Sequence, residues 1–101
     1  MVNREIMHVS HVYSDLAIPP GETLWDELRE RGITQKAFAG TIGRPYQVVN
    51  AIVNGKKAIT AETALQFEKA LGIPAVTWMN LESSYRLTLA RNAIGDSEGA
   101  A

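Results

Sequence analysis

The residues with the clearest chemical potential lie between positions 31 and 61, where every charged side chain is basic. This segment contains Arg31, Lys36, Arg44, Lys56 and Lys57, and it has no Asp or Glu. The flanking segments are acidic in balance, so that the net charge of the whole chain is only -1. A local run of cations inside an acidic frame is typical of a surface that binds a polyanion such as nucleic acid. For five charges taken alone, the alternative is an ordinary solvated helix surface.

The same basic segment has the layout of a helix-turn-helix. Thr34 is a suitable N-cap for a short helix, and a tight turn is expected around Gly43. Pro45 fits the first turn of a second helix, which Asn54-Gly55 closes. In a helix-turn-helix the first helix braces the second, whose N-terminal residues enter the DNA major groove. The pattern therefore predicts a DNA-reading unit in the middle of the chain.

Three further helices are predicted around this unit. One begins at Pro20 and stops at Gly32, one follows the N-cap Thr60 and stops at Gly72, and one opens at Pro74. Because the connections are short, the five helices should pack against one another. The expected fold is all-α: a compact five-helix, repressor-like bundle.

A length of 101 residues predicts one domain. Residues 1–18 are expected to form an N-terminal arm or short strand, residues 19–93 the helical domain, and residues 94–101 a disordered tail. Neither an apolar run long enough to span a membrane nor a signal-peptide pattern is found. A cytoplasmic, nucleoid-associated protein without membrane contact is therefore expected.

The order of several short motifs resembles a known family. The stretch TQKAFAGTIGRPYQVVNAIVNGKKAIT is similar to repressor-type helix-turn-helix proteins. With IPPGETL before it and ETALQFEKALGIPAVTWMNLESSYRL after it, the chain closely resembles the HigA family of antitoxins from about Ile18 to Leu87. The ordered set IPPGE, NGK and LGIPAxxWxNLE is more specific than the helix-turn-helix alone.

This resemblance implies which residues meet DNA. The implied set is Gln35, Lys36, Tyr46, Gln47, Asn50, Ala51, Lys56 and Lys57. Amides such as Gln47 and Asn50 can pair with adenine N6 and N7, Tyr46 can contact a phosphate or a thymine methyl, and lysines give affinity that is independent of sequence. The chain departs from the commonest repressor pattern at Arg44-Pro45, where a Ser or Thr cap usually stands, and Arg44 is expected to contact a phosphate instead.

A homodimer is expected because one recognition helix covers only half a site. A two-fold dimer reads half-sites about 34 Å apart. Our candidate interface is the helix from Pro74 to Arg91, with its stripe Trp78, Leu81, Tyr85 and Leu89. Packing into the core of a single chain is the alternative for this stripe.

Other chemistry has little support in the sequence. There is no cysteine. His8 and His11 have a spacing that two metal ligands on one helix can share, but no third ligand accompanies them. No catalytic motif or phosphate-cradling glycine loop occurs. We therefore expect neither an enzyme nor a site for a metal, a cofactor or a small-molecule substrate.

The resemblance also implies a second partner. Antitoxins of this family typically neutralise an mRNA-cleaving ribonuclease toxin that is encoded beside them, and they repress their own operon at double-stranded operator DNA. The leading hypothesis is therefore the antitoxin of a bacterial type II toxin-antitoxin module. A free-standing repressor without a toxin, and a protein-interaction module with vestigial DNA binding, remain the alternatives.

Overall fold

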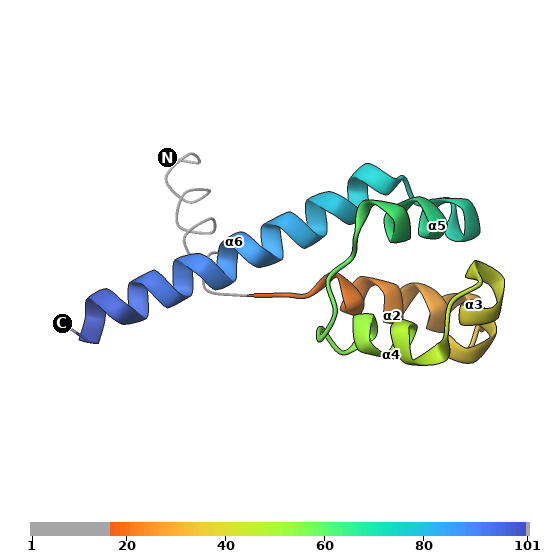
Figure 1. Ribbon diagram of the computed structural model, residues 1–101, viewed down its shortest axis with the longest axis horizontal. Coiled ribbons are helices and arrows are strands. Elements are labelled where there is room, and N and C mark those ends of the chain that lie inside the picture. The colour runs from red at the N-terminus through yellow and green to blue at the C-terminus, as the bar shows by residue number, and fades with distance from the viewer. Residues whose placement is uncertain (1–16, 101) are drawn as a thin grey trace, which may run out of the picture.

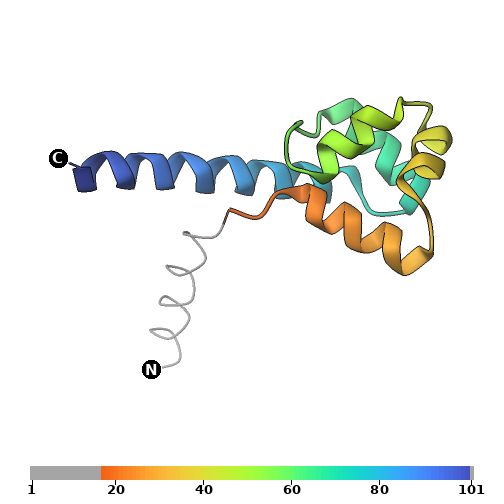
Figure 2. The ribbon, with the colours of Figure 1, turned by 90° about the horizontal axis from the view of Figure 1, so that it is seen from below.

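A computed structural model describes residues 17–100, with side chains for residues 17–95. Within this part of the chain the ordered elements are all helices: α2 (Pro20–Arg31), α3 (Gln35–Ile42), α4 (Tyr46–Val53), α5 (Ala61–Leu71) and α6 (Ala75–Ala100). The start of α6 packs against α5 and α2, and the helix then extends well past the other four (Figures 1 and 2). The expected all-α, five-helix bundle is confirmed.

The helix ends follow from local capping chemistry. Thr34 Oγ1 accepts a hydrogen bond from Ala37 N at 3.0 Å, and Thr60 Oγ1 accepts one from Thr63 N at 3.3 Å, so that both expected N-caps are confirmed. Gly43 ends α3 with a φ of 70°, a left-handed conformation that glycine adopts without strain. These stops fix the tight turn between α3 and α4.

The start of α4 differs by one residue from the expectation. Pro45 is the N-cap of α4 rather than part of its first turn, and the helix begins at Tyr46. Because proline has no hydroxyl or carboxylate, it makes no side-chain hydrogen bond to the free amides of the first turn. The recognition helix thus lacks a side-chain cap, as the sequence predicted.

Three aromatic rings form the centre of the core. The Phe38 and Phe67 centroids lie 5.4 Å apart, and those of Phe67 and Trp78 lie 5.1 Å apart in an edge-to-face arrangement. They connect α3 through α5 to α6. Trp78 is 0% exposed, which corrects its expected place in a dimer interface: its ring is used within one chain.

A close backbone contact joins the start of α2 to the end of α4. A Cβ built on Gly21 would lie 2.0 Å from the carbonyl oxygen of Ile52 and 2.6 Å from that of Val53. Only a residue without a side chain allows this approach. The glycine of the IPPGE motif therefore sets how closely α2 supports the recognition helix.

A buried carboxylate holds the loop that follows α4. Glu82, on α6, is 7% exposed, and its Oε1 accepts a hydrogen bond from Ile59 N at 2.8 Å. Its Oε2 accepts another from Arg86 Nε at 2.6 Å. Since both carboxylate oxygens are used, the last acid of the NLE motif anchors the segment that leads from the recognition helix to α5.

The expectation of a disordered segment from residue 94 is corrected, because α6 runs through Ala100. Packing of Trp78 and Leu81 against the core fixes the first turns of this helix. Beyond these turns α6 continues without contacts to the core. Ile94 illustrates this, with 59% of its surface exposed.

The Gly21 contact predicts a large loss of stability on Gly21→Ala. The added methyl would overlap backbone atoms that have no rotamer to adjust, and the free energy of unfolding should fall by about 3 kcal/mol. Chemical denaturation followed by circular dichroism at fixed protein concentration measures this change.

Gly40→Ala is the matched control. Gly40 lies in helix α3 with open space around its Cα, so this substitution should stabilise the protein by about 0.5–1 kcal/mol. Equal unfolding midpoints for Gly21→Ala and the wild type would contradict the proposed role of the contact.

Candidate nucleic-acid interface

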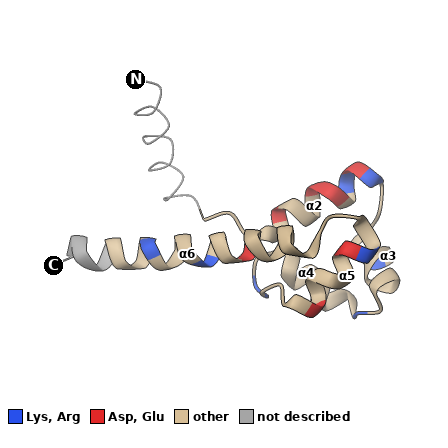
Figure 3. Cartoon of the chain, turned by 90° about the horizontal axis from the view of Figure 1, so that it is seen from above, with Lys and Arg blue, Asp and Glu red and all other residues tan. Residues whose placement is uncertain are grey.

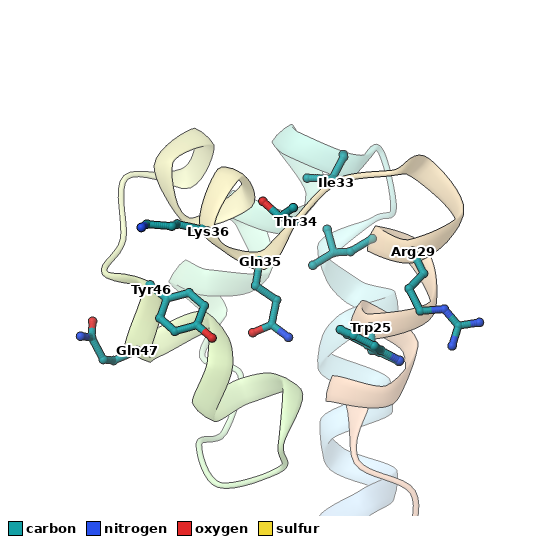
Figure 4. A pocket seen from close by; sticks show the side chains of 9 residues that line it. Trp25, Arg29, Ile33, Thr34, Gln35, Lys36, Tyr46 and Gln47 are labelled. Atoms are coloured by element: carbon teal, nitrogen blue, oxygen red, sulfur yellow. The ribbon is translucent and has the colours of Figure 1, made fainter.

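Most of the expected DNA-binding residues form one surface around α3 and α4. Lys36, Tyr46, Gln47, Lys56 and Lys57 are exposed, and Gln35, Arg44, Asn50 and Ala51 are half-buried. The side chains of Gln35, Lys36, Tyr46 and Gln47 line one groove at the N-terminal ends of the two helices (Figure 4). The fold thus places amides, a phenol and a cation from two helices next to one another.

A chain of amide side chains joins α3 to α4. Asn50 Nδ2 donates to Gln35 Oε1 at 3.1 Å and to the Tyr46 hydroxyl at 3.4 Å. Asn50 Oδ1 in turn accepts from Asn54 Nδ2 at 3.1 Å. Both donors of Asn50 and one of its acceptor positions are therefore occupied.

This network changes the role expected of Asn50. An asparagine pairs bidentately with adenine through one donor and one acceptor on the same edge, and here the donors of Asn50 face Gln35 and Tyr46. Because the Gln35 carbonyl accepts from Asn50, the Gln35 amide nitrogen is left as a donor at the groove. The geometry favours Gln35 as a contact residue and Asn50 as the residue that orients it.

The start of α4 offers exposed groups to a ligand. Tyr46 is 44% exposed and Gln47 is also exposed. The uncapped first turn presents backbone N–H groups, which together with the positive end of the helix dipole favour an anion such as a phosphate. The N-terminal end of α4 combines exposed polar side chains with a backbone that suits an anion.

Arg44 is directed at α5. Its Nε donates to Gln66 Oε1 at 2.9 Å, and its Nη2 donates to Glu62 Oε1 at 3.1 Å. The guanidinium thus ties the α3–α4 turn to α5. A phosphate contact by Arg44 stays a prediction, and it would have to use the donors that these two bonds leave free.

The two lysines after α4 are placed by their own backbone. Ala51 O accepts hydrogen bonds from Lys56 N at 2.8 Å and from Lys57 N at 3.2 Å. These bonds fold the loop back against the end of α4, while both side chains remain exposed. Both lysines are therefore open to a ligand beside the end of α4, and their contact with phosphates stays a prediction.

Two findings on the described residues concern metals and membranes. Among them, no group of three or more His, Cys, Asp or Glu side chains is arranged to hold a metal ion. None of their helices combines the length and the apolar character that crossing a bilayer requires. His8 and His11, like most of the expected N-terminal arm, lie outside the described residues.

Comparison with known proteins identifies the family to which the chain belongs. The family model described as Helix-turn-helix matches residues 26–78, which include α3, α4 and α5. A solved addiction module antidote protein of the HigA family from Coxiella burnetii superposes with a TM-score of 0.75 and 34% identity, over 80% of this chain and 89% of that one. This chain belongs to the HigA family of helix-turn-helix antitoxins.

Two further relatives agree with this assignment. The Pseudomonas aeruginosa antitoxin HigA, solved with the higBA promoter, has a TM-score of 0.76 and 36% identity over 81% of this chain and 90% of that one. Virulence-associated protein I of Dichelobacter nodosus is 36% identical over 75 residues, which are 73% of this chain and 69% of the relative. HigA antitoxins are DNA-binding regulators and not enzymes.

Sequence reasoning missed two residues of this HigA-family surface. Trp25 and Arg29, on α2, line the same groove as Gln35 and Tyr46. The position of Trp25 on the helix could have indicated this. Leu24 and Leu28 mark the buried face of α2, and an exposed tryptophan beside that face does not pack in the core.

The amide network predicts that Gln35 and Asn50 act as a unit. Asn50→Ala removes the group that orients Gln35, and promoter affinity should fall about tenfold, which is about 1.4 kcal/mol. Gln35→Ala alone should cost a similar amount, and the double variant little more than either, because residues that act together are not additive. Fluorescence anisotropy with a labelled promoter duplex measures all four proteins.

Asn80→Ala is the control, since it truncates an exposed amide on α6 away from this surface. Its affinity should equal that of the wild type. If the Gln35 and Asn50 losses simply add, Asn50 contacts DNA on its own and the positioning role is wrong.

Proposed function

We propose that this HigA-family protein is the antitoxin of a type II toxin-antitoxin module, which represses its own operon by binding a pseudo-palindromic operator in the cytoplasm. The observation that carries this proposal is the exposed N-terminal face of α4. There Tyr46 and Gln47 stand beside the oriented amide of Gln35. Such a face fits the edges of bases in a major groove, and the lysines of the following loop fit the phosphates.

The Pseudomonas aeruginosa relative supports the choice of ligand. That HigA protein was solved with promoter DNA, and it is similar to this chain over most of both lengths. An antitoxin that binds its own promoter adjusts its synthesis to its concentration. We therefore take the upstream region of this protein's own gene as its operator.

The proposed dimer uses α6 and the segment that precedes α2. A groove of about 440 Å³ separates them, and it is lined by Ile18, Pro19, Thr23, Leu81, Ser84, Tyr85 and Thr88. Farther along α6, Leu87 is 50% exposed and Leu89 is 38% exposed. Exposed apolar side chains beside an apolar groove give a second copy a surface to cover. Of the expected stripe, Leu81, Tyr85 and Leu89 remain in the proposal.

The proposed toxin is an mRNA-cleaving ribonuclease encoded beside this gene. Membership of the HigA family supports this partner, since antitoxins of the family act on such toxins. The competing functions are a repressor without a toxin and a protein-binding module without operator specificity. They differ in which of the two partners is bound, so one experiment separates all three.

That experiment combines co-purification with a gel shift. Expressed with its adjacent gene, the protein should purify with a small basic ribonuclease and shift the upstream promoter. With roughly 6 to 10 phosphate contacts per dimer, affinity should fall about 10³–10⁵-fold between 50 and 200 mM salt. Gln47→Ala should weaken the promoter complex and leave toxin binding unchanged, because it alters only the DNA-reading face.

Each alternative gives a different result. A promoter shift without a co-purified toxin would indicate a plain repressor. A toxin complex without any promoter shift would contradict the proposed operator binding, and so would affinity that does not depend on salt.

The dimer proposal predicts that Leu89→Asp produces a monomer. A charge in a covered apolar surface is costly, so the variant should sediment as a single chain and bind the promoter at least about 100-fold more weakly. Leu65→Asp, at a residue of α5 that is 58% exposed, should leave both properties unchanged. Sedimentation of Leu89→Asp as a dimer would place the interface elsewhere.

A further inference from the structure

An exposed tryptophan stands beside the DNA-reading surface without a role in the core. Trp25, on α2, is 42% exposed. It lines a groove of about 790 Å³ between α2 and the N-terminal ends of α3 and α4. The groove is lined by Trp25, Leu28, Arg29, Ile33, Thr34, Gln35, Lys36, Tyr46 and Gln47. Four of these nine are among the expected DNA contacts, so the groove is continuous with the proposed interface.

The groove has a mixed apolar and cationic lining. Trp25 and Tyr46 stand on opposite sides of it, with the Gln35 side chain between them (Figure 4). The two cations, Arg29 and Lys36, extend on opposite sides of the same opening. An elongated ligand that alternates apolar and anionic groups matches such a lining.

The acidic residues of α2 do not line this groove. The helix carries four acidic residues, namely Glu22, Asp26, Glu27 and Glu30 (Figure 3). None of them is among the residues that line the groove, whose charged members are the two cations. The residues of α2 that face the groove are therefore apolar except for one cation, Arg29.

Arg29 is held in place by its neighbour on the helix. Its guanidinium carbon lies 5.9 Å from the centroid of the Trp25 ring, within the range of a cation–π contact. On the other side of Trp25, Glu22 joins Gln35 and Asn54 in a smaller hollow. A polyanion is therefore attracted on the Arg29 side of the indole and repelled on the Glu22 side.

We propose that this groove holds the sugar–phosphate backbone of one operator strand, with the Trp25 ring against a deoxyribose and Arg29 on the adjacent phosphate. The proposal rests on the proposed function, and it adds α2 to the DNA interface. Sugars present apolar C–H surface and phosphates a charge, which match the indole and the guanidinium respectively. Such contacts carry no base information, so they act equally on every DNA sequence.

Charge removal at Arg29 tests the phosphate contact. Two labelled duplexes of equal length serve as probes: one from the region upstream of the protein's own gene and one of unrelated sequence. Arg29→Ala should weaken binding to both about five- to tenfold and reduce the slope of log affinity against log salt by about 0.9 per protomer. Lys69→Ala is the matched control, because it removes an exposed cation of α5 outside the groove.

Quenching by acrylamide tests the contact of the indole. Trp25 is exposed and the second tryptophan, Trp78, is 0% exposed, so the neutral quencher reports on Trp25. Saturating the protein with the unrelated duplex at low salt should lower the quenching constant at least twofold. Trp25→Phe should abolish this difference, since only the buried indole then remains.

The outcomes separate the groove from the proposed function. If the wild type binds the upstream duplex specifically while Arg29→Ala matches Lys69→Ala and quenching is unchanged by DNA, the groove proposal is wrong and the proposed function stands. If Arg29→Ala weakens only the upstream duplex, Arg29 reads bases, and a backbone contact is wrong. If the wild type binds neither duplex, both proposals fail together.

Discussion

The column of rings from Phe38 through Phe67 to Trp78 is the interaction on which the rest of the structure depends. It connects the bracing helix α3 to α6 through α5, and all three rings are at most 1% exposed. A core of this size has little other aromatic surface to bury, so the angle between α3 and α6 is set by how these rings fit. The position of the recognition helix α4 follows from that fit, because α4 contacts α3 more extensively than it contacts any other helix.

The candidate DNA-binding side is built from helix ends and polar side chains, and this follows from the way the core is packed. With Val49 and Ile52 buried in the core, α4 has only one face left for a ligand. The buried carboxylate of Glu82 is occupied in holding the frame, because it binds the loop at Ile59. What remains at least partly exposed around α4 is the set of amides, the phenol and the lysines, so the candidate site is made of the positions that the core leaves uncovered.

Local signals made most of the fold predictable. Threonine caps, glycine stops and 3.6-residue periodicity act within a few residues, and the helices they predicted are found, with the start shifted by a residue at α4 and at α6 and with a later end for α6. Long-range partners were beyond reach: that Asn50 is engaged by Gln35, Arg44 by α5, and Trp78 by Phe67 depends on how helices cross. The same limit hid Trp25 and Arg29, since only the packed bundle brings α2 beside the reading face.

The most direct test of the central claim, that α3 and α4 form the surface that binds DNA, is a map of backbone amide chemical shifts in the ¹⁵N-labelled protein with and without its promoter duplex. The structure predicts that the largest changes occur at residues 34–36, 46–50 and 55–57, with the exposed face of α5 around Leu65 unchanged. Changes concentrated on α5, with α4 unaffected, would contradict this account.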